Sequence, residues 1–191
     1  GIVSVESVPN YWVRFLSGTV ILKTAFDFHV TTNQPMIIHQ KAALHVNNPA
    51  TNVYIAKKGA PNSGLTFNGT LRIENGKVFV GSATLDPNKS ADVVYTVNQS
   101  ANLEVLGGEL HVYGFIRRSG GTKAGSIRFV QTGGKIYVMP AKKPSGFAGF
   151  EIYGDTFRMT GGELIYAGSG GALPYGDFLI RSVDTEVTGG T

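Results

Sequence analysis

Cysteine is absent from this chain of 191 residues. Its absence excludes disulfide bonds, thiolate catalysis and metal sites with cysteine ligands. Charged residues are few, at 16% of the chain, and the formal net charge of +4 does not indicate a nucleic-acid partner. No apolar run approaches the roughly 18 residues of a membrane helix, and no stretch keeps a helical periodicity. The sequence therefore predicts neither a transmembrane segment nor a helical fold.

Glycine is abundant instead, with 26 residues, and it marks a repeated unit. The clearest copy, LEVLGGELHV at 103–112, has an alternating apolar and polar run on each side of a Gly-Gly pair. Successive side chains of a strand point to opposite faces, so each run predicts a strand with one buried face. Glycine lets the backbone turn without steric cost. The unit therefore predicts a strand, a tight corner and a second strand.

The unit recurs along the chain. The copies are VRFLSGTVIL, LRIENGKVFV, LEVLGGELHV, FVQTGGKIYV and FRMTGGELIY, with corner glycines at 18, 76, 108, 134 and 162, and TEVTGGT places Gly190 at the same point. The later intervals are 32, 26, 28 and 28 residues, whereas the first, of 58, is twice 29 and predicts a degenerate copy, LHVNNPATNVYI, between its ends. A period of this length indicates a repeat architecture.

A further short apolar segment lies between successive units, for example MIIH at 36–39 and FEIY at 150–153. Each coil then has three short strands. We expect an all-β fold, a right-handed parallel β-helix of about six coils of 26–32 residues. All of 1–191 is predicted to form a single solenoid segment. Because its last residues open a new repeat, we expect it to be part of a longer repetitive protein.

The rows of stacked residues give this fold its register. Positions five and three before the corner glycine, and two and four after it, are apolar in most units, but Gln131 breaks the pattern. Gln131 is either buried and hydrogen-bonded, or a bulge turns Ile127 and Phe129 inward. One outward row reads Lys77, Glu109, Lys135 and Glu163, so that the sign of the charge alternates from coil to coil. Such alternation supports stacked strands.

Two surface features could bind a partner. A mostly apolar outward row contains Phe79, His111 and Tyr137. Either a loop or a neighbouring domain covers this row, or the row strengthens the sheet, or it forms a docking strip for a glycan or a partner protein. Basic doublets follow the second strand of their coils, and adjacent coils contribute Arg117, Arg118, Lys142 and Lys143. These are either solvated loop tips or a contact site for an anionic polysaccharide.

Catalytic motifs are not recognisable. Glycoside hydrolysis requires two carboxylates that face each other across a sugar, and the best available pair, Glu104 and Glu109, only flanks a corner. The histidines lack metal-ligand spacing, and Asp86 with Asp92 is a weak candidate for calcium. We therefore expect no enzyme activity, no cofactor and no metal site.

The units FRMTGGELIY, LEVLGGELHV and LRIENGKVFV resemble the glycine-cornered solenoid repeats of giant bacterial cell-surface adhesins of Bacteroidetes, including gliding-motility adhesins exported by the type IX secretion system. The resemblance covers residues 13–190 and carries no binding residues with it. It implies an extracellular position on the bacterial cell surface and a structural or adhesive role, with surface glycans and neighbouring repeats as partners. The alternatives are a fragment of a β-helical polysaccharide lyase or glycoside hydrolase, and a phage tail-spike-like fibre.

Overall fold

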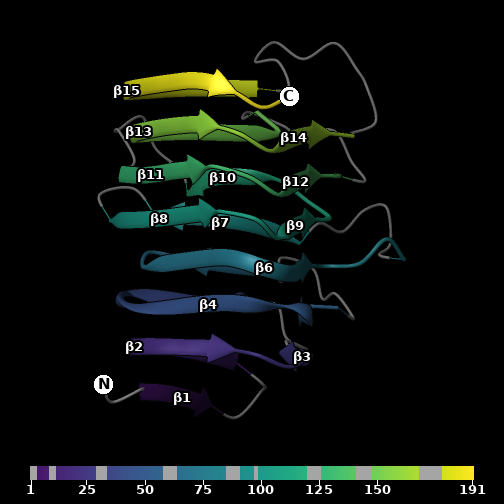
Figure 1. Ribbon diagram of the computed structural model, residues 1–191. Helices are drawn as coiled ribbons and strands as arrows, with labels where there is room; N and C mark the ends of the chain where they lie inside the picture. The colour runs from purple at the N-terminus through teal and green to yellow at the C-terminus, as the bar shows by residue number, and fades with distance from the viewer. Residues whose placement is uncertain are drawn as a thin grey trace.

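The computed structural model describes residues 4–8, 12–28, 34–57, 64–84, 91–96, 99–119, 126–140, 148–167 and 178–191. All regular elements in these ranges are strands, and they form a parallel β-solenoid of about five turns (Figure 1). The strands are β1 Ser4–Val8, β2 Trp12–Leu22, β3 Phe26–Phe28, β4 Met36–Ile55, β5 Gly64–Phe67, β6 Thr70–Val80, β7 Asp92–Thr96, β8 Ser100–Val105, β9 Glu109–Val112, β10 Ile116–Ser119, β11 Ser126–Gln131, β12 Lys135–Val138, β13 Phe150–Thr160, β14 Glu163–Tyr166 and β15 Phe178–Gly189.

Each strand pairs in parallel with its equivalents in the neighbouring coils. One ladder runs β5–β7–β10, the next runs β6–β8–β11–β13–β15, and the third runs β6–β9–β12–β14. In β4 all three segments of one coil are continuous over 20 residues. At the N-terminal end, β1 pairs with β2 in the antiparallel direction. The expected parallel β-helix with three strand segments per coil is confirmed.

Apolar side chains fill the interior in rows that run from coil to coil. One row contains Leu71, Leu103, Phe129 and Phe157, and another contains Val78, Leu110 and Ile136. All of these residues are buried. The degenerate unit at 44–55 keeps the same register, because Leu44 lies beside Leu71 and Val53 lies beside Val78. Alternation in the sequence thus predicts correctly which side chains form the core.

Gln131 takes the first of the two predicted arrangements. It lies in the inward row between Val105 and Met159 and is fully buried. Its Nε2 donates a hydrogen bond to the backbone oxygen of Glu163 at 3.0 Å. Phe129 remains inward as well, so no bulge is needed to keep the core filled.

The first unit, VRFLSGTVIL, is one corner out of phase with the others, which corrects the predicted alignment. Gly18 lies beside Ala42, at the corner that precedes the Leu44 segment, and not at the corner of Gly76. Val20 therefore pairs with Leu44, and Phe26 of β3 fills the place beside Val53. Every corner of the coil separates two alternating strands, so a lone glycine does not tell which corner it occupies.

The predicted charge row is present. Lys77, Glu109, Lys135 and Glu163 lie side by side on successive coils. Lys77 Nζ is 3.0 Å from Glu109 Oε1, and Lys135 Nζ is 2.9 Å from Glu163 Oε1. On the preceding strands Arg158 pairs with Glu186 at 2.8 Å. Exposed pairs of this kind each contribute only about 0–1 kcal/mol, so they mainly favour one register.

Two corner glycines are required for different reasons. Gly162 has a φ of 86°, in the left-handed region that L side chains rarely adopt, and a Cβ there would lie 2.6 Å from the oxygen of Gly133. Gly108 does not share the positive φ, but a Cβ there would lie 2.5 Å from both the oxygen of Gly76 and Cγ2 of Ile73. The close approach of the preceding coil excludes a side chain at Gly108.

Leu110→Asp is expected to abolish cooperative folding or to lower its midpoint strongly, because an unpaired charge in the apolar stack costs several kcal/mol. Thermal unfolding followed by circular dichroism tests this expectation. Thr132→Asp, at an exposed corner position, is the control and should melt like the parent. Parent-like melting of Leu110→Asp would contradict the assigned interior.

Gly162→Ala should lower the free energy of unfolding by about 1–2 kcal/mol, since a left-handed conformation costs that much for an L residue. Gly162→Val should cost more, because the branched Cβ is held against the oxygen of Gly133. Urea unfolding of both variants and of Thr132→Ala measures the difference. Equal stability of Gly162→Val and Thr132→Ala would rule out a strained corner at Gly162.

Candidate functional site

The predicted apolar strip forms a continuous stack of rings on the third ladder. Phe79 and His111 have ring centroids 4.7 Å apart with planes at 25°, and His111 and Tyr137 are 4.5 Å apart at 17°. Tyr54 extends the stack by one coil, with its centroid 5.1 Å from that of Phe79. Tyr54 occupies the same position in the degenerate unit as Phe79 does in the next, so aligning the two units could have revealed it.

Ring stacking limits what this strip can offer to a ligand. The faces of Phe79 and His111 are covered by their neighbours, and Lys57 Nζ lies 4.2 Å from the centroid of Tyr54. A sugar that stacks on an aromatic ring needs a free face, whereas these inner rings present their edges. Offset-stacked pairs each contribute about 0.5–1.5 kcal/mol beyond burial. The strip therefore reinforces contacts between coils, and its role as a docking strip stays a prediction.

One acidic side chain, that of Glu109, contacts the ring stack and the charge row beside it. Glu109 Oε2 is 2.7 Å from His111 Nε2, and its other oxygen is 3.0 Å from Lys77 Nζ. Partial burial raises the pKa of Glu109, but the hydrogen bonds and charges of His111 and Lys77 outweigh this effect. The pKa of Glu109 consequently lies below its usual value, and the carboxylate remains charged as part of a ring-and-charge cluster.

The two carboxylates considered for catalysis belong to separate networks. Glu104 on β8 contacts Arg72, 3.6 Å away, and Arg128, both from neighbouring coils. Glu109 on β9 contacts Lys77 and His111, as described above. Both carboxylates are therefore balanced by cations of the protein itself.

The predicted basic cluster is only partly within the described residues. Arg117 Nε is 2.9 Å from Asp92 Oδ2, and Arg118 Nε is 2.8 Å from Glu151 Oε1. The guanidinium of Arg118 also lies 4.3 Å from the ring centroid of Tyr153. Both arginines thus have acidic partners in adjacent coils. Lys142 and Lys143 lie outside the described residues, as does Asp86 of the candidate calcium site, and contact of this cluster with an anionic polysaccharide stays a prediction.

A tyrosine completes the ladder where β10 leaves β13. These two strands pair only at Ile116 and Phe150. Beyond that point the buried hydroxyl of Tyr95 donates to the backbone oxygen of Glu151 at 3.1 Å and accepts from the amide of Tyr153 at 2.9 Å. Burial raises the pKa of Tyr95 strongly, so the hydroxyl stays protonated and can donate. These two bonds join the coil of β7 to β13 beyond the point where β10 and β13 pair.

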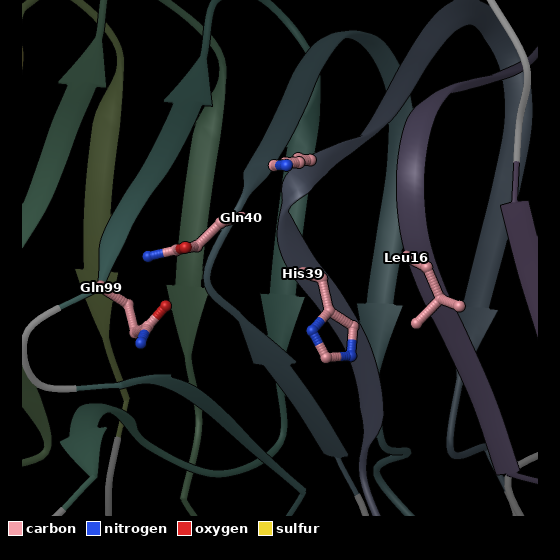
Figure 2. A pocket seen from close by; sticks show the side chains of 5 residues that line it. Leu16, His39, Gln40 and Gln99 are labelled. Atoms are coloured by element: carbon pink, nitrogen blue, oxygen red, sulfur yellow. The ribbon is translucent and has the colours of Figure 1, made fainter.

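A polar notch lies at the corner between the first and second ladders (Figure 2). It has a volume of about 220 Å³, and its lining residues are Leu16, His39, Gln40, Lys41 and Gln99. Gln40 and Gln99 lie on one side of His39, and Leu16 lies on the other. Arg14 Nη2 is 3.3 Å from His39 Nε2. The repeat pattern does not predict this notch, because its lining residues belong to three different coils.

The length of successive corners explains the notch. Between the pairs Ile37–Thr66 and Ala43–Thr70, the coil of β4 has five residues, 38–42, and the next coil has three, 67–69. The coil after that has seven, 95–101, between the equivalent positions. A short corner thus lies between two longer ones, and His39, Gln40, Lys41 and Gln99 of the notch lining come from the longer ones. Unequal spacing between the apolar segments was the available signal.

The parallel stacking, the continuous core and the corner glycines place the protein in the class of β-solenoids. In comparisons with family models, with curated proteins and with solved structures, this chain shows no match. Among the described residues there is no helix long and apolar enough to cross a membrane. Within the same ranges, no three His, Asp or Glu side chains are grouped so that they could hold a metal ion.

Glu109→Gln should weaken the acid dependence of stability. A carboxyl whose pKa is lowered in the folded state stabilises it above the ordinary pKa of about 4.5 and loses that effect as the pH falls through the folded value. Urea unfolding between pH 7 and pH 2.5 should therefore show a shallower decline for Glu109→Gln than for the parent. Asp155→Asn, which removes an exposed carboxylate without an ion pair to another described residue, is the control. If the stability of Glu109→Gln declined with falling pH as steeply as that of the parent, the stabilising contacts of Glu109 with His111 and Lys77 would be contradicted.

Proposed function

We propose that this chain is a structural and adhesive segment of a large bacterial cell-surface repeat protein, which contacts surfaces or glycans without catalysing a reaction. The observation that carries the proposal is the stacking of each coil on its neighbours through parallel ladders. Core rows, ring stack and ion pairs all join each coil to its neighbours. In such arrays stability is a sum over neighbouring contacts, so the fold extends in one dimension and can serve as a spacer.

The use of the charged side chains supports a structural role. Among the described residues, seven acidic side chains form ion pairs with lysine, arginine or histidine of adjacent or nearby strands, namely Glu74, Glu104, Glu109, Glu151, Glu163, Glu186 and Asp92. A general acid with a raised pKa requires a carboxyl without such a partner. This pattern favours a spacer over a β-helical lyase or hydrolase.

The location and the partners are inferred from the glycine-cornered units. Their resemblance to the repeats of gliding-motility adhesins is the support for a place on the bacterial cell surface and for export by type IX secretion. Surface polysaccharides are the partners that this setting suggests. A net charge of +4 would favour anionic ones.

The immobilised chain should retain anionic polysaccharides such as alginate weakly, and more weakly as salt rises, because exposed charges are screened over about 8 Å at physiological ionic strength. Dextran, a neutral polysaccharide, should be retained less. No reducing or unsaturated sugar ends should appear in the same samples. Failure to retain any polysaccharide would contradict the adhesive role, and release of sugar ends would favour the lyase or hydrolase alternative.

A further inference from the structure

We propose that the corner notch binds a single carboxylate-bearing sugar unit of a glycan, with Lys41, Gln40 and Gln99 as its recognition groups. The inference rests on the proposed adhesive function and assigns it a place on the molecule. The notch is distinct from the ring stack and from the arginine cluster. It lies where three coils differ in corner length.

Steric constraints fix the short corner that lies between the two longer ones. Gly69 is in the short corner, where a Cβ would lie 2.1 Å from the oxygen of Ala42 and 2.2 Å from the oxygen of His39. No side chain can therefore occupy this position. The neighbouring Asn68 uses its Oδ1 to accept a hydrogen bond from the amide of Thr96 at 3.1 Å, so its side chain is held against the next coil. The hollow is thus a consequence of how the coils pack.

The polar groups of the lining are available to a ligand. Within the described part of the chain, the ammonium of Lys41 forms no ion pair, and the side-chain amides of Gln40 and Gln99 form no hydrogen bond. This contrasts with Arg117 and Arg118, which have carboxylate partners. Each amide offers two donors and an acceptor, which suits the hydroxyl groups of a sugar, and Leu16 supplies an apolar contact.

The charge of the lining selects the class of sugar. None of the described lining residues is acidic, and the ammonium of Lys41 supplies a positive charge. A ligand with a carboxylate would gain a charge-assisted hydrogen bond from Lys41. A phosphate is less suitable, because phosphate sites commonly use free backbone amides, and the amides of Asn68 and Gly69 both donate to the oxygen of Ile38, at 2.7 and 3.2 Å. The volume of about 220 Å³ is below the range of drug-sized pockets and fits one sugar ring.

Titration of the whole chain with methyl glucuronide, followed by amide chemical shifts in NMR, tests the proposal. Shifts should centre on residues 39–41, 68–69 and 99. Lys41→Gln should weaken binding about tenfold, which corresponds to about 1.4 kcal/mol, and combined Gln40→Ala and Gln99→Ala should weaken it too. Lys23→Gln, which removes the same charge from an exposed position at another corner, should bind like the parent.

Several results would contradict the proposal that the notch binds a carboxylate-bearing sugar. They are equal loss of binding in Lys23→Gln and Lys41→Gln, equal affinity of the parent for methyl glucoside, and tighter Lys41-dependent binding of glucose 6-phosphate. Alginate retention that persists unchanged in Lys41→Gln would refute the notch and leave the adhesive function standing. Absence of alginate retention by the parent would refute the adhesive function, whereas Lys41-dependent glucuronide binding would still support the notch as a binding site. An unchanged melting curve confirms that each variant is folded.

Discussion

Parallel pairing between equivalent positions of successive coils determines the surroundings of nearly every described side chain in this protein. Strands in such a ladder lie about 4.8 Å apart, so each residue has its equivalent from the next coil as its nearest lateral neighbour. Leu110 therefore meets Val78 and Ile136, and His111 meets Phe79 and Tyr137. A one-residue slip would reverse inside and outside for a whole strand. Core, ring stack and charge row all depend on this single constraint.

The same constraint explains why much of the fold can be predicted from the sequence. Alternation around the corner glycines shows which residues of a unit face inward, and a shared period shows which residues stack. The Lys77–Glu109 and Lys135–Glu163 pairs follow directly from these two facts. Position within one coil is harder to predict, because all corners separate similar strands. The phase error at Gly18 has this origin: its glycine and its alternating flanks fit two corners equally well.

Features that depend on differences between coils could not be predicted in this way. The notch requires the corner lengths of three coils to be compared, and these lengths become known only when the register is known. The acidic partners of Arg117 and Arg118 lie in other coils, outside the glycine-cornered units. Tyr95 bridges to β13 because β10 diverges after Ile116, which no periodic pattern encodes. Periodicity thus predicts the features that the coils share, whereas the features that differ between coils cannot be predicted from it.

These differences between coils have a consequence for function. Where equivalent residues stack in register, their polar groups and ring faces are occupied by each other, as in the row from Lys77 to Glu163 and the stack from Tyr54 to Tyr137. Such surfaces bind neighbouring coils firmly to each other, but few of their polar groups and ring faces remain available to a ligand. A change in corner length interrupts the stacking, so that Lys41 lies beside Ser17 of the preceding coil but has no paired residue in the next coil among the described residues. In a solenoid of this kind, binding specificity is therefore to be sought at irregular corners, whereas the regular ladders provide the stiffness that holds those corners in place.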